Sequence, residues 1–415
     1  MVAVVIRPLA HSEEIFAAAH AYTGHSVRVH GRLDIGALAA AFDAVVHSHP
    51  VLGARLERDT HGRHTLVTSA ARPRLSVTEG DPDQLLTGAI LDQARALGTV
   101  CVVRERARAS VTLLTNHCIA DGTHTVTIFA DLWSYYTDIV EGRAIQPREA
   151  GFPLPAEELL VARGIEKLPL DQADPDQTQV PPPMPEPDPQ PVDDAGFLLL
   201  HTTRIRLTRD QTGALSALAR DANVTVNGLV SAAILLAESR FRGLTMSELI
   251  FTCAVDLRTR VSPAVGPTEG TNMVGSAVYT PTDASPTDLV ELARDINASV
   301  RDQIADGIPQ QMPLHIADMS AGAVVVPTQL IVGATNLGRV PHLPTPADLT
   351  LDDFRITMAG KPLAIGSPRA SSASCNISIF DERLSIEVHH AESACTAERR
   401  RMDLIQAGLL AAIAG

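Results

Sequence analysis

Hydrophobic and polar positions in the first part of the chain follow the periods of strands and helices in turn. Residues 26–30 alternate with period two, which predicts a strand, and Asp34 precedes a predicted helix over which apolar residues recur at helical spacing. Apolar runs at 100–103 and 111–115 predict two more strands. A second helix is predicted after Gly122. Its apolar stripe consists of Val126, Phe129, Trp133, Tyr136 and Val140. Strands and helices therefore alternate in this part.

The later part of the chain repeats this alternation. Helices are predicted at 214–219, at 226–241 after a cap at Thr225, from Ser285-Pro286 to about residue 303, and after a cap at Thr396. Strands are predicted at 197–207, 249–255, 329–334, 376–380 and 384–388. The pattern as a whole predicts an α/β fold in which an α/β sandwich is built twice.

A proline-rich segment separates the two parts. Seven of the eleven residues at 181–191 are proline, and such a stretch favours extended polyproline II over a helix or an interior strand. We interpret 168–196 as a crossover linker between an N-terminal domain, 1–167, and a C-terminal domain, 197–415. A disordered insertion within one domain is the alternative.

Composition narrows the class of protein. The 415 residues carry a net charge of −14 and few aromatic side chains, which argues against nucleic acid as the main partner. No apolar run reaches the ~20 residues of a transmembrane helix, and the start reads as a strand without the basic region of a signal peptide. Five widely spaced cysteines do not predict a zinc site or a disulfide framework. We expect a cytoplasmic monomer.

The segment 113–123 carries the clearest chemistry. An apolar strand is predicted to end at Asn116, and His117, Asp121 and Gly122 follow before the next helix. A strand end holds an imidazole rigidly, and glycine permits a sharp turn. Neutral histidine is a suitable general base near pH 7 because its unperturbed pKa is about 6.5. The spacing therefore predicts a catalytic base at His117.

This segment resembles the HHxxxDG motif of the condensation and CoA-dependent acyltransferase superfamily, with Asn116 in place of the first histidine. Similar elements of that superfamily occur in the expected order. They are His49-Pro50-Val51-Leu52 with Arg55, Asp256-Leu257-Arg258-Thr259-Arg260-Val261, Gly270-Thr271-Asn272-Met273-Val274-Gly275, and Thr335-Asn336-Leu337-Gly338-Arg339-Val340. The chain is most similar to polyketide-associated acyltransferases of the phthiocerol dimycocerosyl transferase type.

The resemblance implies two chloramphenicol-acetyltransferase-like α/β sandwich domains with the active site in a tunnel between them. It also implies an O-acyltransferase that moves an acyl group from a CoA or acyl-carrier-protein thioester to a hydroxyl of a polyketide, lipid or other secondary metabolite. The expected partners are thus the thioester donor, carried by CoA, a carrier protein or a polyketide synthase, and a small-molecule acceptor. Neither a cofactor nor a metal is expected.

The resemblance also assigns roles to single residues. His117 is the general base, and Asp121 and Gly122 are structural, with Asp121 paired to Arg258. Removing one partner of such a buried pair costs roughly 3–5 kcal/mol. Three further residues are candidates for binding the substrate or polarising the thioester oxygen, because their side chains can donate hydrogen bonds. They are Asn336, Asn116 and Arg339.

Several alternatives remain open from the sequence. An amide-forming condensation catalyst would use the same base, while a non-catalytic homologue would only bind a carrier or lipid, and a hydrolase would use water as the acceptor. The spacing of His117, Asp121 and His124 also fits metal ligands, although the turn at Gly122 disfavours this. Cys118 could form an acyl-enzyme, but strand alternation favours a buried residue.

Two groups of arginines have two interpretations as well. Arg104, Arg106 and Arg108 would share one face of a strand by alternation, and Arg399-Arg400-Arg401 form a short basic run. Each is interpreted first as a solvated face. The alternative is a docking surface for an acidic carrier protein or for the phosphates of CoA.

Overall fold

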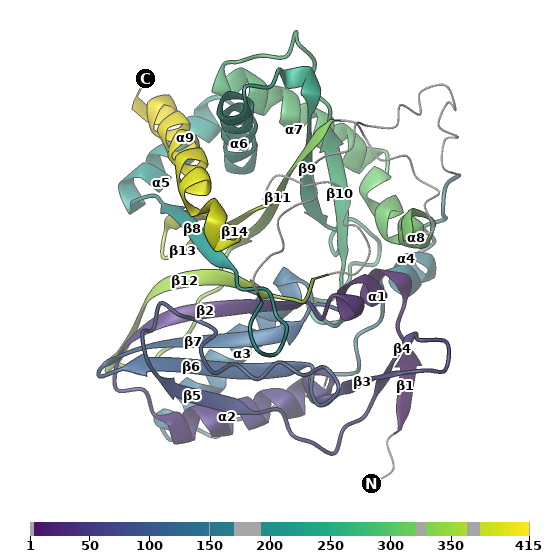
Figure 1. Cartoon of the computed structure of the whole chain (residues 1–415), viewed down its shortest axis with the longest axis vertical. Helices are drawn as coiled ribbons and strands as arrows, with labels where there is room; N and C mark the ends of the chain where they lie inside the picture. The colour runs from purple at the N-terminus through teal and green to yellow at the C-terminus, as the bar shows by residue number, and fades with distance from the viewer. Residues whose placement is uncertain (1–3, 149, 170–191, 321–328, 363–373, 415) are drawn as a thin grey trace. The chain divides into compact units, whose positions relative to one another are not determined.

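The computed structural model describes residues 4–148, 150–169, 192–320, 329–362 and 374–414, which form two compact units (Figure 1). Unit 1 consists of Met1–Gly164, Val261–Met273 and Val340–Lys361. Unit 2 consists of Ile165–Arg260, Val274–Arg339 and Pro362–Gly415. Both units combine helices with β-sheet, which confirms the predicted α/β class.

The chain passes between the two units more often than a single linker predicts. Segments 261–273 and 340–361 follow the predicted linker in the sequence, yet they belong to unit 1. The second segment carries strand β12 (Leu349–Ala359), which pairs with β2 (Tyr22–Gly31) from one end to the other. Pairing of these backbone groups explains why this segment returns to unit 1. Residues 170–191 of the predicted linker lie outside the described residues.

A five-stranded sheet of order β12-β2-β7-β6-β5 forms the centre of unit 1. It is completed by β7 (Arg108–Asn116), β6 (Gly98–Glu105) and β5 (Leu75–Glu79). Only the β5–β6 pair is parallel in this sheet. Strands β6 and β7 are almost entirely buried, as expected for apolar strands in the middle of a covered sheet. A separate three-stranded sheet contains β1 (Val5–Pro8), β4 (His64–Val67) and β3 (Arg55–Arg58).

The helices of unit 1 begin largely where side-chain caps predict. Asp34 caps α2 (Ile35–Ser48) by accepting a hydrogen bond from Ala37 N, as the sequence indicated. Helix α3 (Gly122–Val140) packs on α2 and contacts β2 and β7 (Figure 1). Its apolar stripe is buried at Phe129, Trp133 and Tyr136. The short helices α1 (His11–Ala18) and α4 (Ala156–Ala162) complete this unit.

Unit 2 is built on a six-stranded mixed sheet of order β10-β9-β11-β13-β14-β8. In chain order the strands are β8 (His201–Arg206), β9 (Leu249–Asp256), β10 (Val274–Tyr279), β11 (Leu330–Arg339), β13 (Cys375–Phe380) and β14 (Arg383–His390). Strand β11 pairs in parallel with both β9 and β13 at the middle of the sheet. The outer pairs are antiparallel, so the apolar centre of the sheet is parallel and its edges are not.

Among the described residues, five helices accompany this sheet. They are α5 (Arg209–Asp221), α6 (Val226–Arg242), α7 (Leu289–Ala305), α8 (Ile308–Ser320) and α9 (Cys395–Ala414). Thr225 caps α6 as predicted, but α7 begins at Leu289 and not at Ser285-Pro286. Asp288 accepts hydrogen bonds from Val290 N and Glu291 N, whereas Ser285 Oγ accepts one from Thr282 N in the preceding turn. The carboxylate cap therefore sets the start of this helix.

One finding concerns membrane spans. Within the described ranges, no single helix combines the length and apolarity needed to cross a bilayer, and α5 with α6 reaches that limit only as a pair bent by 102°.

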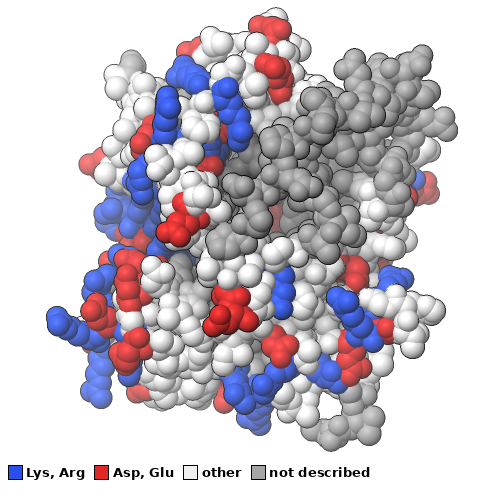
Figure 2. Space-filling view, in the orientation of Figure 1, with Lys and Arg blue, Asp and Glu red and all other residues white. Residues whose placement is uncertain are grey.

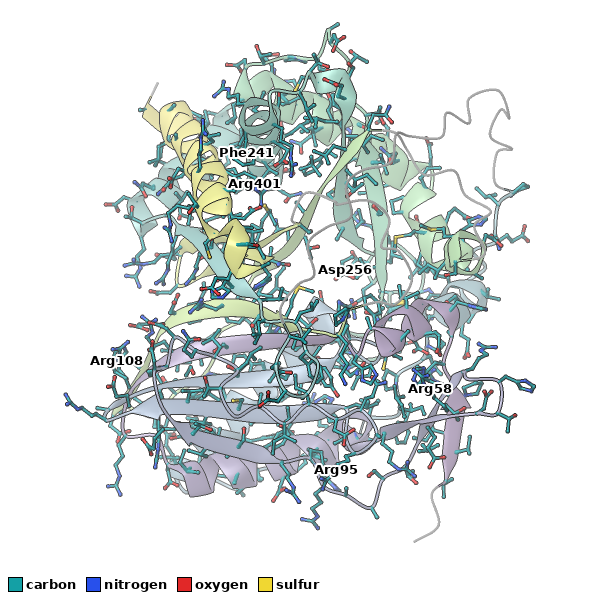
Figure 3. All side chains as sticks on the ribbon, viewed as in Figure 1. Arg58, Arg95, Arg108, Phe241, Asp256 and Arg401 are labelled. Carbon is teal, nitrogen blue, oxygen red and sulfur yellow. The ribbon has the colours of Figure 1, made fainter. Side chains whose placement is uncertain are left out.

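Both predicted arginine groups are corrected by the structure. Strand β6 ends at Glu105, and Arg106, with a φ of 55°, lies in the turn before β7, so Arg104 and Arg108 do not share one strand. Arg108, the first residue of β7, is labelled in Figure 3. Arg399 and Arg400 are exposed on α9. Lys and Arg side chains gather at the upper left of Figure 2, the part of the view in which Figure 1 shows α9. Arg401 is only 1% exposed, and its guanidinium bonds to Glu398 and Glu238. The run of three is therefore not one basic face.

Candidate active site

His117 is the first residue beyond β7, in unit 1. Its backbone N–H donates to the Ala21 carbonyl at 2.8 Å, and Asn116 beside it is paired in register with Tyr22 of β2. Both neighbouring positions, Asn116 and Cys118, are 0% exposed, whereas His117 itself is partly exposed. His117 is thus a partly exposed residue between two buried ones, and it follows the end of a buried strand, which is the position that the sequence predicted.

The His117 ring is stacked on the ring of Phe16 from α1. The two ring centroids are 4.0 Å apart, and the ring planes are inclined by only 12°. This near-parallel contact covers one face of the imidazole and restricts its rotation. The sequence did not single out Phe16, because α1 is short and its contact with His117 joins positions far apart in the chain.

A second contact fixes the backbone of the same residue. Asn272 Nδ2 donates to the His117 carbonyl oxygen at 2.8 Å. Its neighbour Thr271 accepts a hydrogen bond at its carbonyl oxygen from Asp121 N, at 2.9 Å. The segment 261–273 is therefore bonded at both ends of the turn 117–121. Asn272 appeared in the sequence only as part of a motif, and its partner explains why a side-chain amide is placed there.

Asp121 is the N-cap of α3. Its Oδ1 accepts from His124 N and its Oδ2 accepts from Met273 N, each at 2.9 Å. Both carboxylate oxygens thus bond to backbone N–H groups, and the negative charge lies at the helix N-terminus, where it is favoured. Gly122 is the first residue of α3, but it is not among the glycines of positive φ. The extended backbone of Asp121, with ψ of −175°, makes the turn that the sequence pattern places at Gly122.

Burial lowers the pKa of the His117 imidazole below its ordinary value of 6.5. Its own carbonyl, the charge of Asp121, the Asn272 side chain and the Ala120 carbonyl act in the opposite direction. No group among the described residues makes a full hydrogen bond to Nδ1, which is buried. The ring is therefore neutral near pH 7, which is the form that a general base requires.

A second histidine influences this site. His25 of β2 is 1% exposed and packs near Phe354 of β12, with ring centroids 5.4 Å apart. Burial, together with the charge that His117 would carry when protonated, lowers the pKa of His25 to about 3. His25 therefore stays neutral in the physiological range and adds no charge beside His117.

Asn116 occupies the position at which the superfamily motif has its first histidine. Its side chain is 0% exposed, and Nδ2 donates to Gln93 Oε1 at 3.1 Å. Its Oδ1 accepts from Cys118 N at 3.1 Å, which closes a tight turn around His117. These contacts hold both ends of the amide inside unit 1, and a substrate-binding role for Asn116 remains a prediction.

The neighbouring groups considered for other chemistry are buried. Cys118 is fully buried, and burial raises the pKa of its thiol well above the ordinary value, so it is a protonated thiol near pH 7. His124 is 1% exposed, and its Nδ1 lies 3.1 Å from the Gly270 carbonyl oxygen. In the part of the chain that the structure describes, no three His, Cys, Asp or Glu side chains are grouped to hold a metal ion.

The remaining predicted site residues belong to unit 2. Arg258 is 4% exposed at the end of β9, and its Nη1 lies 3.1 Å from Asp256 Oδ1. Asn336 of β11 donates to Asn227 Oδ1 at 2.9 Å and accepts from Gly338 N at 2.7 Å, and Arg339 ends the same strand. The predicted Asp121–Arg258 pair, and the roles of Asn336 and Arg339 toward substrate, remain predictions.

Comparisons with known proteins show which class of protein the chain resembles. A structure of polyketide synthase associated protein 5 from Mycobacterium tuberculosis matches with a TM-score of 0.78 and 30% identity, covering 98% of this chain and 99% of that one. The first condensation domain of the calcium-dependent antibiotic synthetase matches with a TM-score of 0.67 at 13% identity, over 98% and 97% of the two chains, which shows a shared fold. The fold and sequence together define an acyltransferase of the condensation superfamily.

The sequence relatives narrow the class to one family. Residues 198–389 match the family profile described as phthiocerol/phthiodiolone dimycocerosyl transferase C-terminus. A phthiocerol/phthiodiolone dimycocerosyl transferase of Mycobacterium leprae (strain TN) is 33% identical over 409 residues, which are 95% of this chain and 94% of that protein. The chain belongs to the phthiocerol/phthiodiolone dimycocerosyl transferase family.

Proposed function

We propose that the chain transfers an acyl group from a CoA or carrier-protein thioester to a hydroxyl group of a polyketide-derived lipid, with His117 as the general base. The names of the relatives support an acyl group and a polyketide-lipid acceptor. The observation that carries the assignment of the base is the partly exposed, neutral His117 ring at a rigid strand end.

In the proposed reaction, His117 removes the proton of the acceptor hydroxyl while its oxygen attacks the thioester carbonyl carbon. Nδ1 is buried, so Nε2 is the nitrogen assigned to this proton. Collapse of the tetrahedral intermediate breaks the carbon–sulfur bond, and the thiolate receives the proton back from the imidazolium. The products are one ester and one free thiol. Such proton transfer by a positioned base contributes roughly 10²–10⁴-fold to a rate.

The remaining residues of the site support this base without taking part in bond making. Asp121 stabilises the start of α3 and favours the imidazolium that forms during the reaction. Asn116 and Asn272 hold the backbone on the two sides of His117. Because a neutral base is needed, the rate is expected to fall as the pH drops through the lowered pKa of His117.

The test is product analysis. The protein is incubated with a panel of acyl thioesters and of acceptors, namely long-chain alcohols or diols and the matching amines. The released thiol is titrated, and the organic products are identified by mass spectrometry. We expect one ester for each thiol released. Free acid in place of ester would identify a hydrolase, amide formed only with amine acceptors would identify a condensation catalyst, and binding without thiol release would identify a non-catalytic homologue.

A further inference from the structure

The stacked Phe16 ring is the contact that most directly restricts the His117 side chain. An imidazole on a strand end can rotate about its two side-chain torsions, and a rotated ring would turn Nε2 away from the acceptor. A ring held at a centroid distance of 4.0 Å, with its plane 12° from parallel to the Phe16 ring, leaves little room for such rotation. The apolar face of Phe16 also keeps water from one side of the imidazole.

Helix α1, which carries Phe16, cannot hold this position by itself. It has eight residues, and isolated helices of that length are not stable in water. Its location therefore depends on contacts to the rest of unit 1. The structure supplies these contacts through charged side chains near the start of the helix, next to the turn that carries Phe16.

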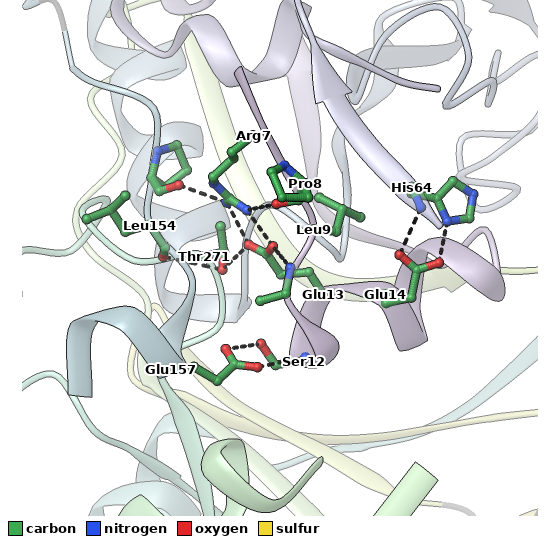
Figure 4. A network of polar contacts seen from close by, with 12 residues as sticks. Arg7, Pro8, Leu9, Ser12, Glu13, Glu14, His64, Leu154, Glu157 and Thr271 are labelled. Carbon is green, nitrogen blue, oxygen red and sulfur yellow. Dashed lines mark hydrogen bonds and ion pairs between the residues drawn. The ribbon is translucent and has the colours of Figure 1, made fainter. Parts of the chain in front are cut away.

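Glu13 is the central anchor. Its carboxylate is 0% exposed and receives both terminal nitrogens of Arg7, at 2.6 and 2.7 Å (Figure 4). Glu13 also accepts from Thr271 Oγ1 and from Ala10 N, each at 2.9 Å. The Arg7 guanidinium reaches further to the Pro153 carbonyl oxygen at 3.0 Å. A buried carboxylate with this many donors is rigidly placed, because loss of any one would leave a buried polar group unpaired.

Two other carboxylates fasten the same helix. Glu157 accepts from Ser12 N and Ser12 Oγ, at 2.9 and 2.7 Å. Glu14 contacts His64 Nδ1 at 2.6 Å and accepts from His64 N at 3.2 Å (Figure 4). Helix α1 is thus bonded to β4 on one side and to α4 on the other, and Phe16 follows directly in its next turn.

The same network reaches the second contact on His117. Thr271, which donates to Glu13, precedes Asn272, and Asn272 donates to the His117 carbonyl oxygen. The carbonyl of Thr271 also accepts from Asp121 N. One connected set of buried and partly buried hydrogen bonds therefore fixes both the surface on which the imidazole lies and the backbone that carries it.

We propose that Phe16 is a positioning residue for the general base, holding the His117 imidazole in the orientation in which it accepts the proton of the acceptor. This inference rests on the proposed function. Phe16 acts through His117, and the Arg7–Glu13–Thr271 network serves to keep Phe16 in place. The titratable groups that influence His117 from the adjoining elements are Asp121 and His25, and neither is altered in the test below.

The test compares Phe16→Leu, which keeps an apolar side chain without a flat face, with Phe16→Tyr, which keeps the ring. The matched control is Ile15→Ala, since Ile15 lies beside Phe16 on α1 and is 41% exposed. For Phe16→Leu we expect kcat to fall about 10–100-fold, the effect of a misplaced reacting group, with KM for the thioester changed little. Phe16→Tyr should retain kcat within about threefold, and Ile15→Ala should match the wild type.

The pH profile of kcat/KM distinguishes positioning from stability, because a loss of stability alone would not shift it. Without the covering ring, the His117 imidazole is better solvated, so the acidic limb of kcat/KM in Phe16→Leu should move to higher pH. Wild-type kcat and an unmoved limb in Phe16→Leu would overturn the inference. Equal losses in Phe16→Leu and Phe16→Tyr with a lowered melting temperature would also overturn it, in favour of a purely structural role.

Two further results keep the test decisive. If Phe16→Leu does not fold, Phe16→Met offers a flexible side chain of similar volume, and the same fall in kcat is expected. Full activity of His117→Ala would refute the proposed function itself. A dependence of kcat on Phe16 in a chain whose His117→Ala variant is inactive supports both.

Discussion

At the scale of single residues, the polar side chains around His117 bond to backbone groups. Asp121 accepts from two backbone N–H groups, Asn116 from one, and Asn272 donates to one carbonyl. Such contacts fix the path of the chain at the strand end that carries His117. The sequence predicted His117, Asp121 and Gly122 from their spacing, because that spacing is local. It could not predict Phe16 or Glu13, since the contacts that tie them to the site, with His117 and Thr271, join positions far apart in the sequence.

Asp121→Asn separates a structural role of this residue from a catalytic one. The amide keeps one acceptor oxygen, so one of the two backbone N–H groups loses its partner and the charge at the N-terminus of α3 is lost. We expect the unfolding free energy to fall by about 1–2 kcal/mol and the rate to fall with it. Thermal melting and turnover are measured on the same sample. An unchanged melting temperature with a lost rate would make Asp121 a direct partner of the imidazole.

Two glycines give a matched pair for stability. A Cβ at Gly275, in the motif segment 270–275, would lie 2.1 Å from the Pro309 carbonyl oxygen, whereas a Cβ at Gly213 in α5 would meet nothing within 4 Å. Gly275→Ala should therefore lower the unfolding free energy by about 1–3 kcal/mol. Gly213→Ala should raise it by about 0.5–1 kcal/mol, because alanine favours the helix. Chemical denaturation measures both, and equal stabilities would contradict the close approach at Gly275.

At the scale of elements, the sequence predicted helix starts that depend on neighbouring residues. It did not predict a strand that depends on a partner far away in the sequence. The caps Asp34 and Thr225 set helix starts where the sequence placed them. The turn at Arg106 was missed because it lacks the Asn-Gly or Asp-Gly pair that marks most short hairpins. Strand β12 was missed too, since its partner β2 lies near the start of the chain.

The buried histidine of strand β2 predicts a pH-dependent stability. The pKa of His25 is about 3 in the folded chain and about 6.5 when unfolded, so between these values the unfolded chain binds more protons. The unfolding free energy is therefore highest above pH 6.5 and decreases as the pH falls. Protonation of His25 in the unfolded chain lowers it by about 2 kcal/mol at pH 5. The lowered pKa of His117 acts in the same direction.

The measurement is the change in unfolding free energy between pH 7.5 and pH 5. His25→Leu removes the titrating group from an apolar position, so the decrease should be about 2 kcal/mol smaller than in the wild type. His61→Ala, at an exposed position, serves as the control and should show the full decrease. A decrease of wild-type size in His25→Leu would show that other groups cause the acid sensitivity.

At the scale of the whole molecule, the two units are not two consecutive pieces of chain. Unit 1 needs residues 261–273, which carry Thr271 and Asn272, and residues 340–361, which carry β12. The sequence predicted two α/β parts because the alternation of strands and helices occurs twice. It could not show that later segments return to unit 1, because the pairing of β12 with β2 produces no recognisable pattern in the sequence of either strand.

Because unit 1 includes later segments of the chain, residues 1–164 are predicted not to fold alone. Residues 1–164 lack β12, so the edge of β2 and several buried apolar side chains lose their cover. We expect this fragment to aggregate or remain unfolded when expressed by itself, and to become soluble when co-expressed with residues 192–415. Circular dichroism and size-exclusion chromatography decide this. A monomeric, cooperatively melting 1–164 fragment would contradict the description of unit 1.

The central claim is that His117 is the base of an ester-forming acyl transfer, and the most direct measurement is ester formation by His117→Ala beside the wild type. His61→Ala controls for loss of a histidine at an exposed position. We predict that His117→Ala keeps the wild-type melting temperature within a few degrees and loses at least about 10²-fold in ester formed per unit time. Ester formed at the wild-type rate by a folded His117→Ala protein would contradict the account.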